Sequence, residues 1–186
     1  MSRIILASAS PRRRELMELA GYDFEVICAD IVEAVPENVQ PQEVVMSLAL
    51  QKAQAVAAEN EDAVVVGSDT VVALDGKILG KPHSESEACE MLRLLSGRTH
   101  KVFTGVAVVG DGKEKSFFDE TDVEFYPLGE DEIKKYVATG EPMDKAGAYG
   151  IQGGAALFCK EIRGDFFSIM GLPVSLLARH LRTFAA

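Results

Sequence analysis

Some segments of the chain have continuous or alternating hydrophobic residues, and others have hydrophobic residues three or four positions apart. The first pattern predicts strands and the second predicts helices. Short continuous runs rich in valine and isoleucine are typical of strands covered on both faces. The predicted strands cover residues 3–6, 23–32, 63–74, 99–109, 114–126 and 157–162. Helical spacing predicts helices from Pro11 and over residues 42–59, 85–95, 130–139 and 173–182. No internal repeat or linker interrupts the pattern, which indicates one α/β domain over residues 1–186.

A turn of small residues separates the first predicted strand from the first predicted helix. Ser10 is a favourable N-cap, and Pro11 suits the first helical position. Arginines at positions 12–14 then occupy the first turn, where the helix dipole disfavours each cation by about 0.3–1 kcal/mol. An anion held by free backbone N–H groups, Ser8 and the guanidinium groups would remove this conflict. The pattern alone leaves two interpretations open, a phosphate site and a solvated basic turn.

Two charged residues lie where the pattern otherwise predicts burial. Lys52 is in line with Leu48 and Val56 on the apolar side of a predicted helix. A lysine there must extend to solvent, pair with a carboxylate or point into a cleft. Asp69 interrupts the most apolar predicted strand, where an unpaired carboxylate is costly. Pairing or metal binding would satisfy Asp69, and a turn between two shorter strands is the alternative.

Three further positions are weaker candidates, and each has a purely structural alternative. Glu33 lies in a loop, where it is either a metal ligand or a solvated carboxylate. The hairpin signal Asp75–Gly76 should bring Lys81 close to Asp69, although an ordinary surface lysine would look the same. Gln152 lies in a long stretch rich in glycine and alanine, which suits either contact with a ligand or an irregular connector. Its amide can offer a donor and an acceptor to a nucleobase.

Composition narrows the range of partners. The chain has 29 acidic and 19 basic residues and a net charge of −10, which argues against a general nucleic-acid or membrane-surface binder. Three scattered cysteines and the lack of a long apolar run suggest a reducing, cytoplasmic location. Cations that hold phosphates beside carboxylates that hold a divalent ion indicate metal-assisted phosphoryl chemistry. Neither the Gly-x-x-x-x-Gly-Lys-Ser/Thr loop nor a Rossmann glycine fingerprint is present.

Five segments spread over nearly the whole chain form long, specific motifs. They are Leu6–Arg13, Gly67–Val72, Lys81–Pro82, Ser96–Gly97 and Asp144–Gly153. Together they resemble the motifs of the Maf family of nucleoside triphosphate pyrophosphatases. The resemblance implies a Maf/Ham1-like (ITPase-like) α/β fold, with a mixed, curved β-sheet, flanking helices and two lobes around a deep cleft. It also implies a homodimeric enzyme that hydrolyses nucleoside triphosphates to monophosphate and pyrophosphate as house-cleaning of the nucleotide pool.

The resemblance further implies a substrate subgroup. Family members that act on dTTP and UTP carry Arg, Thr and Gln at the positions of Arg12, Thr70 and Gln152. The sister group that acts on 7-methyl-GTP carries different residues at all three positions. The expected substrates are therefore dTTP and UTP, with CTP and modified pyrimidine nucleotides as further candidates. A 7-methyl-GTP or ITP-type pyrophosphatase and a nucleotide-sensing regulator of septum formation are the alternatives.

The resemblance also implies roles for single residues. Asp69 is the expected catalytic residue, as a base or a water-orienting group, and it is expected to share Mg²⁺ or Mn²⁺ with Glu33. The expected phosphate-binding residues are Ser8, Arg12, Arg13, Lys52 and Lys81. Arg14 has no counterpart in the motif and is expected at the surface. The net charge of −10 disfavours the remaining alternative, a nucleic-acid-binding role for the arginines.

Overall fold

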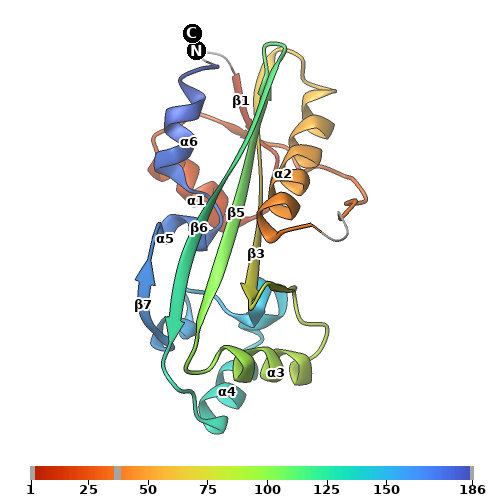
Figure 1. Cartoon of the computed structure of the whole chain (residues 1–186). Coiled ribbons are helices and arrows are strands. Elements are labelled where there is room, and N and C mark those ends of the chain that lie inside the picture. Colours follow the sequence, from red (N-terminus) through yellow and green to blue (C-terminus); the bar gives the residue numbers. More distant parts are fainter. Residues whose placement is uncertain (1–2, 36–38, 185–186) are drawn as a thin grey trace. The chain divides into compact units, whose positions relative to one another are not determined.

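The chain forms a mixed α/β structure, as the hydrophobic pattern predicts. A computed structural model describes residues 3–35 and 39–184 (Figure 1). Its strands are β1 (Arg3–Leu6), β2 (Glu25–Val26), β3 (Ala63–Leu74), β4 (Lys77–Leu79), β5 (Thr99–Gly110), β6 (Lys113–Phe125) and β7 (Cys159–Arg163). Its α-helices are α1 (Pro11–Leu19), α2 (Pro41–Ala57), α3 (Glu85–Leu95), α4 (Glu130–Val137), α5 (Phe166–Met170) and α6 (Val174–Leu181). Short 3₁₀ helices are η1 (Glu141–Asp144), η2 (Ala146–Ala148) and η3 (Gly154–Leu157).

The strands join in one sheet in the order β2-β1-β3-β5-β6-β7, and β4 pairs with β3. Strand β1 runs parallel to β2 and to β3, whereas the β3–β4 and β6–β7 pairs are antiparallel. The sheet is therefore mixed, as expected. The predicted hairpin at Asp75–Gly76 is confirmed, since both residues have the positive φ angles, 51° and 78°, that a tight hairpin turn needs.

The chain divides into two compact units, each built from segments that are distant in the sequence. The first unit comprises Met1–Asp69, Thr104–Asp119 and Gly171–Ala186, and the second comprises Thr70–Phe103 and Glu120–Met170. The predictions of a single domain over residues 1–186 and of a cleft between two lobes stay predictions. None of the helices in the described ranges combines the length and the apolar character that a membrane span needs.

Helix α2 packs very closely against the sheet in the first unit. A Cβ atom added to Gly67 of β3 would overlap the carbonyl oxygen of Ala49, and one added to Gly105 of β5 would overlap the backbone of Val45. Neither position admits a side chain unless the helix backbone moves. The buried apolar cluster beside this contact contains Ile5, Ala7, Ala49, Ala53, Val56, Ala63, Val65 and Ala107. Small residues on both elements thus hold α2 at a short distance from β3.

Buried aromatic rings form the centre of the second unit. The Phe125 ring lies edge-on to His100 and Tyr149, with ring centroids 4.8 and 4.9 Å away. His100 Nε2 lies 2.8 Å from the Tyr149 hydroxyl, and His100 Nδ1 is buried with no hydrogen-bond partner among the described residues. Burial raises the pKa of Tyr149, so its hydroxyl stays protonated. A second proton on His100 would therefore create a buried charge with an unpaired N–H group.

Lowering the pH from about 6.5 to about 4 is expected to reduce the free energy of unfolding through His100. Burial lowers the pKa of His100 from 6.5 to about 4. Between these values the unfolded chain binds a proton that the folded chain excludes, so acid favours unfolding by up to about 3 kcal/mol. Urea unfolding across this pH range, compared between the wild type and His100→Gln, measures the effect. The variant should show a shallower pH dependence, and equal slopes would contradict the prediction.

The predictions and the structure differ at two elements. The strand expected over residues 23–32 is wrong in extent, since β2 contains only Glu25 and Val26. Its partner β1 ends at Leu6, whose carbonyl accepts a final hydrogen bond from the backbone N–H of Ile27. Further along, Val32 is 98% exposed, so apolar character there does not reflect a buried strand. Helix α5 has no counterpart among the predicted elements.

Candidate functional site

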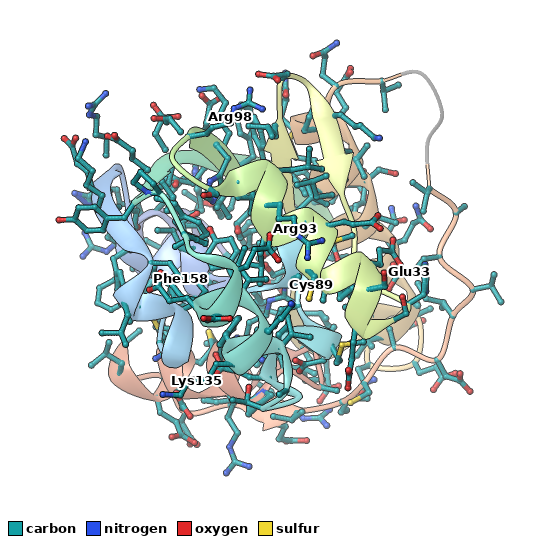
Figure 2. All side chains as sticks on the ribbon, turned by 90° about the horizontal axis from the view of Figure 1, so that it is seen from below. Glu33, Cys89, Arg93, Arg98, Lys135 and Phe158 are labelled. Atoms are coloured by element: carbon teal, nitrogen blue, oxygen red, sulfur yellow. The ribbon has the colours of Figure 1, made fainter. Side chains whose placement is uncertain are left out.

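Three charged side chains of the first unit meet at one ammonium group. Lys52 Nζ lies 2.6 Å from Asp69 Oδ1 and 3.0 Å from Glu33 Oε1. The Lys52 and Asp69 side chains are each 15% exposed, whereas Glu33 is 42% exposed. Figure 2 labels Glu33 on the segment that precedes α2. This group, here called the Lys52 cluster, is partly buried yet open to solvent on the side of Glu33.

Close packing of α2 on β3 explains why Lys52 reaches Asp69. Gly67 lies two residues before Asp69, and its missing side chain lets the backbone of α2 approach the strand at Ala49. Lys52 follows one turn later on the same helix, between residues whose side chains are buried. Of the three possibilities open to a lysine at this position, pairing with a carboxylate is the one the structure adopts.

Asp69 follows a buried serine that links three segments of the first unit. The Ser68 hydroxyl is inaccessible to solvent and lies 2.9 Å from the carbonyl oxygens of both Gly105 and Gly171. It donates its single proton to one of these acceptors at a time. The backbone immediately before Asp69 is therefore tied to β5 and to the segment before α6, which limits movement of the Asp69 carboxylate.

The turn between β1 and α1 forms a second polar group in the first unit. Arg13 Nη1 donates to Ser8 Oγ at 3.2 Å, and Arg13 Nε donates to the carbonyl oxygen of Gly171 at 2.9 Å. The N-cap prediction is confirmed, because Ser10 Oγ accepts from the Arg13 backbone N–H at 3.4 Å. Ser8 itself is buried. An arginine, a serine hydroxyl and a helix N-terminus thus converge, as an anion site requires.

Electrostatics connect Arg13 with the Lys52 cluster. Burial lowers the pKa of the Arg13 guanidinium, and the negative charges of Asp69 and Glu33 oppose that shift. The positive charge of Arg12 acts in the same direction as burial. Arg12, Asp69 and Glu33 therefore lie close enough to Arg13 to influence its charge. Two cations held near each other on a half-buried surface favour a bound anion, which would relieve their mutual repulsion.

The third arginine of the turn behaves differently. Arg14 is exposed, and its Nε lies 2.9 Å from Glu18 Oε1 one turn later on α1. The prediction that Arg14 is a surface residue is confirmed. An exposed pair of this kind contributes about 0.3–0.5 kcal/mol to the helix, which is consistent with a purely local role.

Three predicted site residues belong to the second unit. Thr70 follows Asp69 directly in β3 and is half-buried, and Lys81 and Gln152 are both exposed. Lys81 comes just after β4, and Gln152 lies between η2 and η3. The roles predicted for these three residues in binding a substrate stay predictions.

The two carboxylates of the Lys52 cluster suit a divalent cation that prefers oxygen ligands and needs only one or two from the protein. Glu33 and Asp69 each contact the same ammonium nitrogen, so their oxygens are close enough to share one cation. Among the described residues, no three His, Cys, Asp or Glu side chains converge to form a complete metal site. Mg²⁺ commonly uses one or two carboxylates and takes its other ligands from water and substrate phosphates. The donor set therefore suits a metal whose coordination a phosphate completes.

Sequence reasoning missed two groups that support this site. Ser68 and the carbonyl oxygen of Gly171 form the hydrogen bonds that hold the strand end and Arg13. The signal for Ser68 was its position in an apolar strand directly before Asp69. Gly171 has a φ of 116°, which favours glycine, but a backbone carbonyl acceptor 158 residues from Arg13 has no local sequence signal.

Comparisons with known proteins find similar sequences and a similar fold. The chain matches a family model described as Maf-like protein over residues 3–184. A protein of Bacillus cereus (strain AH820) named dTTP/UTP pyrophosphatase is 53% identical over 184 residues, which is 99% of this chain and 96% of the relative. A Bacillus anthracis protein of the same name has the same identity and coverage. A HAM1 protein from Coxiella burnetii aligns with a TM-score of 0.53 and 18% identity over 98% of this chain and 100% of its own, which indicates a similar fold.

Proposed function

The chain belongs to the Maf family, and on this premise we propose that it is a nucleoside triphosphate diphosphatase acting on dTTP and UTP. The products are the nucleoside monophosphate and pyrophosphate. The Bacillus relatives, which are named dTTP/UTP pyrophosphatases, support this substrate class. The observation that carries the proposal is the Lys52 cluster, in which one half-buried ammonium holds two carboxylates beside a cationic helix start.

Hydrolysis needs a group that orients water and accepts a proton, and Asp69 is the residue we assign to it. The oxygen of the water forms a bond to the α-phosphorus while the bond from that phosphorus to the pyrophosphate oxygen breaks. The proton released by the water passes to the Asp69 carboxylate. Lys52, 2.6 Å from Asp69 Oδ1, fixes the orientation of this carboxylate through a charge-assisted hydrogen bond.

Cationic and hydroxyl groups bind the phosphates of the substrate in this proposal. Arg13 and Ser8, already hydrogen-bonded to each other, offer a preorganised donor pair at the start of α1. Arg12 and Lys52 add positive charge near the position where phosphate oxygens gain negative charge during the reaction. We assign Lys81 of the second unit to the same task. Preorganised charges of this type lower the barrier because they need no rearrangement during the reaction.

Glu33 and Asp69 would hold Mg²⁺ or Mn²⁺ together with the substrate phosphates. When bound, such an ion would withdraw charge from the phosphate oxygens. The exposure of Glu33 suits a ligand that is completed from the solvent side. Selection among nucleobases is assigned to Arg12, Thr70 and Gln152, because an amide matches the acceptor and the N–H donor on the edge of uracil or thymine.

A substrate panel tests the assignment. We expect the protein to release pyrophosphate from dTTP and UTP with kcat/KM about 100-fold above that for 7-methyl-GTP or ITP, since a site built to hydrogen-bond one base edge rejects a mismatched one. The measurement is monophosphate plus pyrophosphate from dTTP, UTP, CTP, 7-methyl-GTP and ITP with Mg²⁺ or Mn²⁺. A lead for 7-methyl-GTP or ITP would overturn the pyrimidine assignment. Tight nucleotide binding without turnover would favour the nucleotide-sensing alternative.

The cellular location and the oligomeric state of the protein are also part of this proposal. We propose that the protein acts in the cytoplasm as a homodimer, as the family resemblance implies. Sedimentation equilibrium of the purified chain, with a mass of 20.1 kDa, distinguishes a monomer from a dimer.

A further inference from the structure

A phenol–carboxylate pair in the second unit clamps the segment that carries Gln152. The Tyr136 hydroxyl donates to Glu141 Oε1 at 2.9 Å and accepts from the backbone N–H of Gly150 at 3.0 Å. Glu141 Oε2 accepts from the backbone N–H of Gly154 at 3.0 Å. Gln152 lies midway between the two glycines. Both ends of its segment are therefore bound by the same two side chains.

Steric contacts show that this segment is shaped around the Glu141 carboxylate. A Cβ atom added to Gly153 would overlap that carboxylate, so a larger residue there would displace the Glu141 side chain from its present position. A Cβ atom added to Gly150 would lie 2.7 Å from the side chain of Lys145. The backbone of Gly153 also closes a turn by donating to the carbonyl oxygen of Gly150 at 3.1 Å. The backbone of residues 150–154 thus lies in close contact with the Glu141 carboxylate.

The pair itself rests on rigid elements. Tyr136 lies on α4, is 5% exposed, and its ring packs edge-on against Phe158 with centroids 5.2 Å apart. Phe158 is labelled in Figure 2. Glu141 begins η1, and its carbonyl oxygen accepts from Lys145 Nζ at 2.7 Å. Burial raises the pKa of Tyr136, so its hydroxyl remains protonated and continues to donate to Glu141. Neighbouring groups therefore hold both Tyr136 and Glu141, the two residues of this clamp, in place.

We propose that Tyr136 and Glu141 are positioning residues for base selection, because they hold the Gln152 segment in the conformation that presents its exposed amide to the nucleobase. This inference rests on the proposed function, in which Gln152 reads a pyrimidine edge. Recognition of a base edge requires the amide to be placed within a few tenths of an ångström, and a segment rich in glycine does not provide this by itself. The clamp provides the missing rigidity through two hydrogen bonds from the segment to Tyr136 and Glu141, which are hydrogen-bonded to each other.

Tyr136→Phe is the principal test, because it removes both hydroxyl hydrogen bonds with little change in volume. We expect the ratio of kcat/KM for dTTP over CTP to fall about tenfold, mainly through a higher KM for dTTP. Glu141→Gln should lower the same ratio, since the amide cannot accept from Tyr136 and Gly154 as a carboxylate does. Hydrolysis of CTP by both variants should fall much less than hydrolysis of dTTP.

Tyr126→Phe is the matched control. Tyr126 belongs to the same unit and is 51% exposed, so loss of its hydroxyl should leave the dTTP/CTP ratio unchanged. A purely structural role for the clamp would lower activity on all nucleotides in parallel with Tm, and this result would overturn the inference. A Tyr136→Phe variant with an unaltered ratio would overturn it as well.

A binding measurement separates the inference from the proposed function. The Kd values of dTTP and CTP are measured in EDTA by titration calorimetry for the wild type and Tyr136→Phe. If the wild type hydrolyses no pyrimidine nucleotide, the proposed function fails, but the Kd ratio still decides the inference. A rise of about tenfold in Kd for dTTP relative to Kd for CTP in Tyr136→Phe supports positioning, and a constant ratio refutes it.

Discussion

Asp69→Asn is expected to lower kcat for dTTP by about 10²–10⁴-fold, the range that a positioned acid or base contributes. Asparagine has the same shape as aspartate but cannot accept the proton released by the attacking water. It also loses the ion pair with Lys52, whose ammonium lies 2.6 Å from Asp69 Oδ1. The measurement is pyrophosphate release from dTTP with saturating Mg²⁺ or Mn²⁺, together with Tm of both proteins.

The fold should survive this replacement. Lys52 keeps Glu33 as a partner at 3.0 Å, so the lysine is not left unpaired. Asp62→Asn is the matched control, because Asp62 pairs with Arg3 at an exposed position of the same unit and should leave kcat unchanged. Near-normal turnover by Asp69→Asn would sink the assignment of Asp69. Equal loss in the Asp62 control would point instead to a general electrostatic effect.

Gly67→Ala is expected to lower the free energy of unfolding by about 3 kcal/mol, at the upper end of the usual cost of overpacking. The new Cβ atom would overlap the carbonyl oxygen of Ala49, which belongs to a helix backbone and cannot rotate away. For a chain of this size the loss corresponds to a fall of roughly 6–12 °C in Tm. Because α2 must shift, Lys52 should also lose its close contact with Asp69, and activity should fall with stability.

Gly80→Ala provides the comparison for this effect. A Cβ atom at Gly80 would meet no atom of the described residues within 4 Å, and the Gly80 backbone does not adopt the left-handed conformation. Its Tm should therefore stay within about 2 °C of the wild type, as for an ordinary surface substitution. Equal Tm values for the two alanine variants would show that α2 does not depend on the close approach at Gly67.

Two elements with a strong local pattern were predictable to the residue. The run at 63–74 forms β3 and the pattern at 85–95 forms α3, each with the predicted bounds. In these segments the hydrophobic pattern continues over many residues and the ends are clearly marked. Ser84, for example, caps the start of α3, and its hydroxyl accepts from the backbone N–H of Glu87 at 3.2 Å. The run at 23–32 lacked this support, because the length of β2 depends on where its partner β1 ends.

The candidate site was predictable as a set of residues but not as a set of contacts. Lys52 and Asp69 stood out because each lay where burial was expected, and each had several possible explanations. Glu33 had no such signal, and its contact with Lys52 depends on the path of a loop. The clamp formed by Tyr136 and Glu141 was also invisible in the sequence, since the groups that it holds are the backbone N–H groups of two glycines.

The sequence by itself determined the α/β class, the main strands and helices, the family and the chemical types available for a site. These features depend on local periodicity and on motifs, which neighbouring residues specify. Only the tertiary structure decided which charges meet, because the Lys52–Asp69 contact depends on how closely α2 approaches β3 at Gly67. It likewise decided that Arg13 is held by Ser8 and by Gly171, a partner 158 residues away. Such distances are set by packing of the whole unit, which no local pattern encodes.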